Sequence, residues 1–491
     1  MKTYQDLVNV PDEGKGDFCV EAVTEFRGTK EYAEAKDGER YYNKHNTTIE
    51  QFQKFLYTVS GKQVKDIFSA NYKLKTLFFR RLCQQQIQYV LGNGLKLEKP
   101  ENKEKLGKNF DFKLQLAAKR AMAGGRAFGF WNLNHLEVFG YADTPSQPGF
   151  CPLYDEETSQ LMAGIRYWYR QIGLDVIFHC TLYEPDGYTD YIQTNNDPVR
   201  MKDRKHGYIK TIKRTAVGVD EELESNYSGL PIIPLYANDS HESELVGIKE
   251  SIDCYDYIKS GLANDIDDTA GFYWILKNEG GMDDPDLAKF IQRMKSVRAA
   301  VVEDGTEAEA HTLEIPTDAR NTMLEILRRD IYEDFQALDV STLSAAAKTT
   351  QEIQAAYQSQ DNKCADFEYY VLDFVQKILE LAGISDNPTF TWNRVVNQSE
   401  QTNMVLSAAN YLSDECVIRH LPFLTPEEAM AEIEKRQDEE IKRFSADDEE
   451  DDDDEEEGLI LSELLRQIHR KNAERSRKAA TAGISGSAQR A

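Results

Sequence analysis

The strongest constraint on the fold of this chain is the segment 230–277, in which a short apolar run precedes a long amphipathic pattern. Pro231 and Pro234 lie in the apolar run, which is typical of a strand and ends at the polar turn 237–240. Apolar residues at spacings of three and four then predict a helix over 244–268, about 37 Å long.

The two faces of this predicted helix differ in polarity. Its apolar stripe consists of Leu245, Ile248, Ile252, Tyr255, Ile258, Leu262 and Ile266. Its charged face consists of Glu250, Asp253, Asp256, Lys259, Asp265 and Asp268. One apolar stripe on so long a helix needs cover from the same domain or from other copies of the chain.

The overall charge argues against a general nucleic-acid binder. The 491 residues suffice for about two to four domains. Their net charge of −27 would repel the phosphate groups of a nucleic acid. The unbroken acidic run 447–457 repels itself, which predicts a solvated linker. The alternative is that it mimics DNA or captures a basic partner. The basic helical pattern 459–480 that follows either pairs with this run or docks on DNA or on another protein.

The cysteines and the apolar runs indicate the compartment. Seven cysteines are dispersed without a C-x-x-C pair, which is typical of a reducing cytoplasm and argues against a disulfide framework or a zinc ribbon. We expect neither a signal peptide nor a membrane segment, since no apolar run follows basic residues at the start and none approaches ~20 residues.

Before residue 230 the pattern predicts helices packed on an antiparallel sheet, an α+β arrangement. Residues 1–45 are polar and poorly periodic, which predicts an arm or flexible lead-in. Helices are expected over 48–58, 71–90 and 110–123. Strands are expected at 128–132, 136–139, 164–171, 176–183 and 188–193, followed by a loop-rich segment over 195–227.

After the long helix, a compact unit precedes a second helix. Strands are expected at 272–276, 299–302 and 311–315, with a helix over 284–295. The second helix covers 318–338, small residues fill 339–347, and a third long helix covers 348–381 with Gly383 as its C-cap. A strand at 390–396 and helices over 400–412 and 425–442 complete the pattern.

Three motifs occur in a fixed order. They are NYKLKTLFFRRLCQQQIQYVLGNGLKLE at 71–98, IDCYDYIKSGLANDIDDTA at 252–270 after the proline-bracketed strand, and the stretch 390–441 with NRVVNQSEQTNM and SDECVIRHLPFLTPEEAMAEIEKRQDEE. Taken in this order, the three motifs extend over most of residues 71–441. In this the chain resembles the portal proteins of tailed bacteriophages, in particular the portal type of long-tailed phages of Gram-positive hosts.

The resemblance implies an α+β ring subunit with an α/β wing, a two-helix stem, a small α/β clip, a long helix after a tunnel loop, and a helical crown. The implied boundaries are an N-terminal arm (1–45), wing (46–243), first stem helix (244–270), clip (271–316), second stem helix (317–338), tunnel loop (339–347), long helix and wing return (348–398), crown (399–443), acidic linker (444–458) and basic C-terminal helix and tail (459–491).

The resemblance also implies which residues meet partners. The tunnel loop would present Val340, Ser341, Thr342, Leu343, Ser344 and Lys348 to DNA. The clip would meet terminase and connector proteins through Asp284, Lys289, Arg293 and Lys295. The stem would present Asp265, Asp267 and Asp268 to the channel. The loop lacks an Arg/Lys cluster, which suits a duct, because tight phosphate binding would resist movement of DNA.

The implied function is a ring of twelve subunits at a capsid vertex of the virion, assembled in the host cytoplasm. It would conduct double-stranded DNA during packaging and ejection. The implied partners are other copies of the chain, the terminase large subunit, the major capsid or scaffold protein and a head–tail adaptor, with no membrane. The alternative is a helical adaptor or scaffold protein of virion assembly that closes no ring.

Motifs for an enzyme are weak, and we expect no catalytic residues, metal or cofactor. The chain has no G-K-[ST] phosphate loop, no G-x-S-x-G and no H-E-x-x-H. A nucleic-acid enzyme with acidic metal ligands is a further hypothesis. Its candidate ligands are Asp239, His241, Glu242 and Glu244, or the stem acids between subunits, although acids are favoured near a helix start without any metal.

Overall fold

The computed structural model describes residues 1–57, 62–66, 69–195, 197–214, 220–269, 273–277, 307–311, 317–343, 350–393, 402, 405–421, 424 and 428–436. The chain divides into two compact units. The first consists of Met1–Ala345 with Ala356–Asn393, and the second of Ala346–Ala355 with Arg394–Ala491.

The first unit is built on an eight-stranded sheet with the strand order β10-β9-β8-β7-β6-β5-β4-β13. Neighbouring strands are antiparallel except β5 and β6, which are parallel. The strands are β4 (Arg126–Asn132), β5 (His135–Gly140), β6 (Gly149–Tyr154), β7 (Leu161–Ile172), β8 (Asp175–Glu184), β9 (Gly187–Thr194), β10 (Arg200–Met201) and β13 (Ile232–Tyr236). The five strands predicted in this region are confirmed, and so is the mixed α+β class.

Two strand features were not anticipated. Strand β6 carries Pro152 in its interior, so its sequence does not read as a strand. The segment expected to be loop-rich contains the hairpin β11 (Ile209–Arg214) and β12 (Asp220–Ser225). In that hairpin, basic residues of β11 lie opposite acidic residues of β12, as in the pair Lys210 and Glu224, which favours the pairing of two polar strands.

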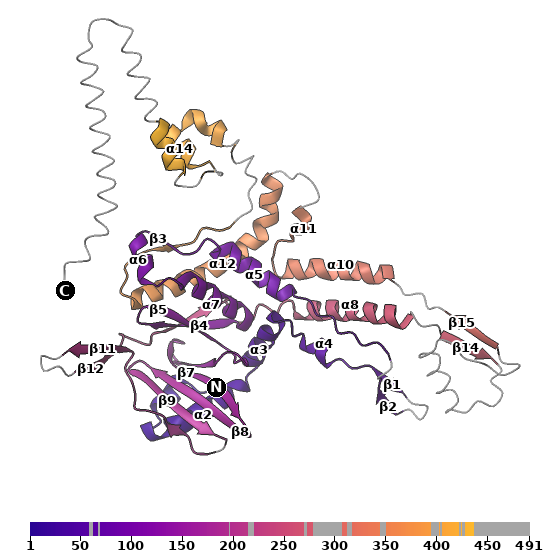
Figure 1. The fold of residues 1–491 in the computed structure, drawn as a ribbon, viewed down its shortest axis with the longest axis horizontal. Coiled ribbons are helices and arrows are strands. Elements are labelled where there is room, and N and C mark those ends of the chain that lie inside the picture. The colour runs from indigo at the N-terminus through magenta and orange to yellow at the C-terminus, as the bar shows by residue number, and fades with distance from the viewer. Residues whose placement is uncertain are drawn as a thin grey trace, which may run out of the picture. The chain divides into compact units, whose positions relative to one another are not determined.

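Helices cover the sheet (Figure 1). Helix α7 (Phe110–Gly124) packs on β4, β5 and β13, and α3 (Lys30–Tyr42) and α5 (Phe78–Leu91) pack on α7. The contact between α3 and α7 is close, because a Cβ on Gly38 would overlap the carbonyl oxygen of Ala123. Helix α2 (Lys15–Arg27) contacts β6 and β7, where its apolar residues join the aromatic core of the sheet.

The expectation of a flexible lead-in over 1–45 is wrong. This stretch forms α1 (Tyr4–Val8), the 3₁₀ turn η1 (Asp12–Gly14), α2 and α3. Phe18, Ala22 and Phe26 recur every four residues on α2 and are buried in the sheet core. The apolar period was present in the sequence, although the polar residues around it obscured it.

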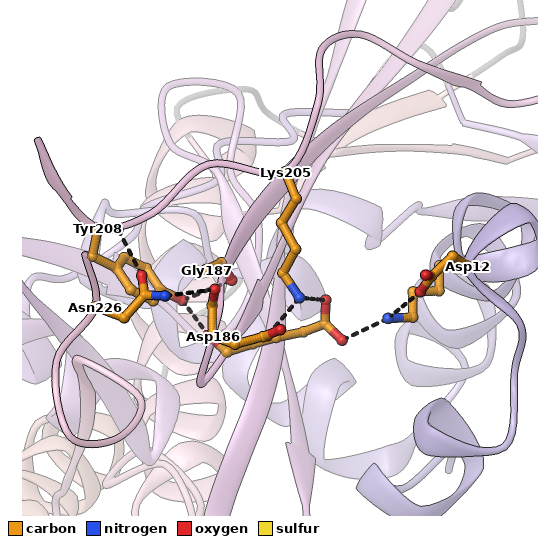
Figure 2. A network of polar contacts seen from close by, with 8 residues as sticks. Asp12, Asp186, Gly187, Lys205, Tyr208 and Asn226 are labelled. Carbon is orange, nitrogen blue, oxygen red and sulfur yellow. Dashed lines mark hydrogen bonds and ion pairs between the residues drawn. The ribbon is translucent and has the colours of Figure 1, made fainter. Parts of the chain in front are cut away.

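A polar network fastens the start of α2 to the sheet (Figure 2). The carboxylate of Glu184, at the end of β8, lies 2.9 Å from the Lys15 amine and 2.8 Å from the Lys205 amine. Burial lowers the pKa of Lys15, but hydrogen bonds to Asp12 and Glu184 outweigh it and raise the pKa above its usual value. The Lys15 amine therefore stays charged and pairs with Glu184. Together with the buried apolar residues of α2, this ion pair makes the N-terminal helices an integral part of the first unit.

The remaining short elements of the first unit are α4 (Thr47–Gln51), β1 (Phe55–Tyr57), β2 (Gln63–Lys65), β3 (Lys96–Leu97), α6 (Pro100–Lys105) and β16 (Pro388–Thr389). The helix expected over 48–58 is shorter than predicted, because a strand replaces its second half. The helix expected over 71–90 begins only at Phe78, and residues 71–77 have no regular secondary structure.

The two predicted stem helices are α8 (Lys249–Thr269) and α10 (Thr317–Asp334), which contact each other side by side (Figure 1). Between them in the chain lies the antiparallel pair β14 (Tyr273–Lys277) and β15 (Glu307–His311). Of the strand expected at 311–315, only His311 is described, and it is the last residue of β15, in which Glu and Ala alternate; residues 312–315 fall outside the described residues. The predicted strand 299–302 and helix 284–295 fall outside the described residues.

Helix α10 ends at Asp334, four residues before the predicted end. Gln336 takes a left-handed conformation with φ 59°. The Gln336 N–H donates to the Glu333 carbonyl at 3.0 Å, and the Ala337 N–H donates to the Tyr332 carbonyl at 2.9 Å. This pattern is a Schellman motif, which terminates a helix. Gly383 ends α12 (Thr350–Leu381) in the same way with φ 67°, as predicted.

In the second unit, the described residues form the 3₁₀ turn η2 (Ala409–Tyr411) and helix α14 (Asp414–Arg419), and residues 428–436 are helical. Ile418, Ala429 and Ile433 form a small core with Leu424 against it. The helical residues 405–408 and 428–436 agree with the helices predicted over 400–412 and 425–442, while the crown as a domain stays a prediction. The acidic run and the basic tail fall outside the described residues. Among the helices that the structure describes, none has the length and apolar character needed to cross a bilayer.

Candidate functional site at the stem helices and the loop base

The buried line on α8 changes from apolar to polar along the helix. Ile248 and Ile252 are buried as predicted. The next residues at four-residue spacing are polar and also buried, namely Asp256 (0% exposed), Ser260 (6%) and Asn264 (3%). Ile266, by contrast, is 56% exposed. The prediction that Asp256 lies on the charged outer face and Ile266 on the covered one is therefore wrong.

What covers this polar line is the backbone of residues 72–76. The Tyr72 N–H donates to Asn264 Oδ1 at 2.6 Å, the Leu74 N–H to Ser260 Oγ at 3.0 Å, and the Thr76 N–H to Asp256 Oδ1 at 3.0 Å. One helical turn of four residues rises about 6 Å, close to the roughly 6.6 Å of two extended residues. One polar side chain from each turn of α8 thus accepts a hydrogen bond from every second backbone N–H of residues 72–76. These side chains take the place of a neighbouring strand, because the segment belongs to no sheet.

The environment of Asp256 raises its pKa. Burial raises it most, and hydrogen bonds from Asn46 and Thr76 lower it by less. Asn46 Nδ2 donates to the second carboxylate oxygen at 2.9 Å. One turn earlier, Asp253 accepts from Tyr41 at 2.5 Å and from Thr48 at 2.7 Å. Two acids of the predicted charged face are therefore occupied within the subunit.

The three acids predicted to face the channel lie at the end of α8. Asp265 forms an ion pair with Arg320 of α10, which ties the two stem helices together. Asp267 is exposed and accepts a long 3.4 Å hydrogen bond from the Tyr72 hydroxyl. Asp268 is a helical residue of α8. Their role toward DNA stays a prediction.

The chain that leaves α10 is held by side chains of two other helices. The Leu338 N–H donates to Gln360 Oε1 of α12 at 3.2 Å, and the Leu338 carbonyl accepts from Gln85 Nε2 of α5 at 2.9 Å. The Lys363 amine of α12 donates to the Phe335 carbonyl at 2.9 Å and pairs with Glu244 at 2.5 Å. The backbone N–H groups of residues 335–338 therefore all have partners although the helix has ended.

Asp339 begins the next turn of chain, α11 (Val340–Leu343). Its carboxylate accepts the Ser341 N–H at 3.0 Å and lies 3.0 Å from the guanidinium of Arg328, which also donates to the Ser341 hydroxyl at 3.2 Å. Burial raises the pKa of Asp339, but the hydrogen bonds from Ser341 and the Arg328 charge outweigh it and bring the pKa below its usual value. We call residues 335–341 the loop base.

The predicted tunnel-loop residues begin on this base. Val340 is 64% exposed, and Ser341 is exposed as well. Thr342 and Leu343 are helical residues of α11. Ser344 and Lys348 fall outside the described residues, as do the clip residues Asp284, Lys289, Arg293 and Lys295. Their roles stay predictions.

Two of the four candidate metal ligands before α8, His241 and Glu244, are engaged otherwise. Glu244 pairs with Lys363 and accepts from Asn238 at 2.9 Å. The ring of His241 stacks on Tyr236 at 3.7 Å, and burial and the nearby Arg126 lower the pKa of this histidine. Within the described part of the chain, no group of three or more His, Cys, Asp and Glu residues is placed to hold a metal ion.

Sequence reasoning missed Gln85, Arg328, Gln360 and Lys363. A signal existed for Gln360, because it lies three residues after Tyr357 and four before Cys364, on the buried stripe of α12. A polar residue at a core position is expected to have a specific partner. Arg328 had no such signal, since an exposed arginine on a helix is ordinary.

Comparison with known proteins identifies the family. The model of the family "Phage portal protein, SPP1 Gp6-like" matches residues 27–443. The portal protein of Bacillus phage SPP1 is 25% identical over 429 residues, which cover 82% of this chain and 83% of that protein. The portal protein of Clostridium phage phiCD119 is 28% identical over 212 residues, 41% of this chain and 47% of that protein, so this match spans about half of that relative.

Solved structures with similar chains come from gene transfer agent (GTA) particles. A chain in the neck of the native particle, computed with C12 symmetry, has a TM-score of 0.38 and 11% identity, covering 71% of this chain and 90% of that one. A chain in the virion of the native particle has a TM-score of 0.40 and 10% identity, with the same coverage. Since the family model spans most of its length, the chain belongs to the family of phage portal proteins of the SPP1 Gp6-like type.

Proposed function

We propose that this chain assembles into a ring at one vertex of a phage capsid and forms the conduit for double-stranded DNA during packaging and ejection. The observation that carries the proposal is the family match over residues 27–443, which includes both stem helices and the loop between α10 and α12. A closed ring of like subunits uses heterologous contacts, so each subunit offers two different faces to its neighbours. The alternative, a helical adaptor that closes no ring, needs no such pair of faces.

The proposed mechanism is geometric and electrostatic, and we assign no reaction and no cofactor to the chain. The net charge of −27 means that the ring as a whole repels DNA instead of holding it. In this proposal the loop that starts at Val340 and continues to Lys348 supplies weak contacts, through hydroxyl groups and one amine. Asp265, Asp267 and Asp268 belong to the repelling wall, which lets DNA slide in either direction, and Asp265 contributes least because Arg320 offsets its charge.

The partners are proposed by region. The clip, with Asp284, Lys289, Arg293 and Lys295, meets the terminase large subunit during packaging and a head–tail adaptor afterwards. The wing meets the major capsid or scaffold protein. The ring has about twelve subunits, forms in the host cytoplasm, and remains in the virion.

Negative-stain electron microscopy with light scattering tests the proposal. We expect rings with a central hole and a mass of about twelve subunits of 56.1 kDa each. The purified chain is measured alone and together with the phage scaffold and capsid proteins, because a ring protein can need a partner to nucleate assembly. Absence of rings in both conditions would favour the adaptor.

A further inference from the structure

We propose that Arg328, Gln85 and Gln360 are positioning residues that hold the last part of the loop base, Leu338–Ser341, and so set where the DNA-facing loop begins. This inference rests on the proposed function and adds to it the side chains that place the loop. It comes from the convergence of three helices on a few residues that belong to no long element.

The first observation is the double anchoring of Leu338. Leu338 is buried, and both of its backbone polar groups are bonded to side chains, the N–H to Gln360 and the carbonyl to Gln85. The Gln85 amide also lies 3.4 Å from Gln360 Oε1, so the two glutamines bond each other and Leu338. A buried backbone group without a partner is costly, which makes any other path for Leu338 unfavourable.

The second observation is that the Arg328 side chain binds Asp339 and Ser341 in the next turn of chain. One nitrogen of its guanidinium lies 3.0 and 3.2 Å from the two carboxylate oxygens of Asp339 and 3.2 Å from the Ser341 hydroxyl. Arg328 stands on α10, eleven residues before Asp339, so the chain must fold back along its own helix to make this contact. Charge-assisted hydrogen bonds of this kind are stronger and more directional than neutral ones.

The third observation is that the anchors belong to both sides of the loop. Arg328 precedes the loop in the chain, whereas Gln360 and Lys363 lie on α12, which resumes after it. The bond from Leu338 to Gln360 therefore closes the loop at its base. A loop whose base is fixed by a satisfied polar network starts from a defined place, as a functional site requires.

The test compares two charge reversals on adjacent residues of α10. Arg328→Glu places a carboxylate next to Asp339 and removes the hydrogen bonds to Asp339 and Ser341. Arg329→Glu makes the same change of charge on a side chain that is 65% exposed and contacts only Asp330 and Glu333 among the ion pairs of the described chain. Full-length rings of both variants are compared by mass, by amide hydrogen exchange of peptides over 336–343, and by the amount of DNA packaged with the phage's own terminase and capsid.

We expect rings of unchanged mass for both variants. Arg328→Glu should speed exchange in the 336–343 peptides by about tenfold and lower packaged DNA severalfold, while Arg329→Glu should match the wild type. Gln85→Met removes the donor to the Leu338 carbonyl without changing the charge of the chain, and it should have the same effects as Arg328→Glu. If Arg328→Glu forms no rings, Gln85→Met alone tests the positioning role.

Two results would overturn the inference. One is wild-type packaging in rings of both Arg328→Glu and Gln85→Met, and the other is an equal loss in Arg329→Glu. Deletion of residues 340–346 separates this failure from that of the proposed function. If the deletion impairs packaging but the anchor variants do not, only the positioning role falls. If the deletion packages DNA normally, the loop assignment itself falls.

Discussion

The carboxylate of Asp256 accepts the backbone N–H of Thr76 at 3.0 Å, although 180 positions separate the two residues. This bond is the first of three that lay the segment 72–76 along the first stem helix. The segment leads directly into α5, which carries Gln85. The helix proposed to line the channel is thus tied to the helix that anchors the loop base through a short stretch of backbone.

Replacing Asp256 by Asn should destabilise the subunit. Asn46 Oδ1 already accepts from Ile49 and Tyr41, so the Asn46 amide cannot turn to accommodate a second amide donor. One buried donor then faces another, and we expect the free energy of unfolding to fall by about 1–3 kcal/mol. Chemical denaturation measures this change. Asp267→Asn on the exposed part of the same helix is the control and should stay within about 0.5 kcal/mol of the wild type.

The effect of Asp256→Asn should depend on pH. Because the pKa of Asp256 in the folded chain lies above its usual value of 3.8, folding favours the protonated carboxyl. Its contribution is fully present below 3.8 and is lost as the pH rises through the higher folded value. The stability advantage of the wild type over Asp256→Asn should therefore be larger at pH 4 than at pH 7. An advantage that grows with pH would show that the folded pKa is depressed.

Two helical glycines should respond in opposite ways to alanine. A Cβ at Gly38 of α3 would overlap the Ala123 carbonyl of α7, so Gly38→Ala must push the helices apart and cost about 1–3 kcal/mol. At Gly261 of α8, a methyl group would have no described atom of a neighbouring element within 4 Å, and Gly261→Ala should stabilise the subunit by up to about 1 kcal/mol. Thermal unfolding of the two variants, measured on unassembled subunits, distinguishes packing from helix propensity.

Exchanging the charges of Asp265 and Arg320 should test the tie between the stem helices. Arg320→Asp alone places two acids together and should cost about 0.2–1 kcal/mol, because both side chains are partly exposed. Adding Asp265→Arg should recover most of this loss. A double-mutant cycle by chemical denaturation gives the coupling energy, and additive losses would mean that the pair contributes nothing.

Deletion of residues 340–346 should leave the ring intact and impair packaging or retention of DNA. The residues up to Leu338 keep their own anchors in α5 and α12, so we expect the fold of the subunit to survive the deletion. Electron microscopy of the variant reports the ring, and a nuclease-protection assay reports the DNA. A ring that fails to form would mean that the loop is part of the subunit interface.

Much of the framework was predictable because its signals are local. Helix α7 matches its predicted span to within one residue, and the left-handed Gly383 ends α12 where its sequence places a C-cap. The strands β7, β8 and β9 were visible in alternating aromatic and β-branched residues. Each of these signals lies within the few residues that form the element.

Other features were misread because their partners are distant in the chain. Asp256, Ser260 and Asn264 look like part of a solvated face, and only the backbone of residues 72–76 makes that face an interior. The N-terminal helices look polar until the sheet, more than a hundred residues later, covers Phe18, Ala22 and Phe26. A polar face on a helix can therefore be interpreted as exposed or buried only once the element that packs against it is known.

The sequence by itself determined the family, the order of the sheet strands, the paired helices α8 and α10 and the long helix α12, and the acidic character of the chain, since these depend on composition, period and motif order. The tertiary structure alone decided which acids form hydrogen bonds or ion pairs within the subunit and which side chains hold the loop base. The reason is physical: hydrogen bonds such as those of Leu338 with Gln85 and Gln360 join residues whose separation along the chain carries no periodic signal. Only the folded backbone brings such residues together.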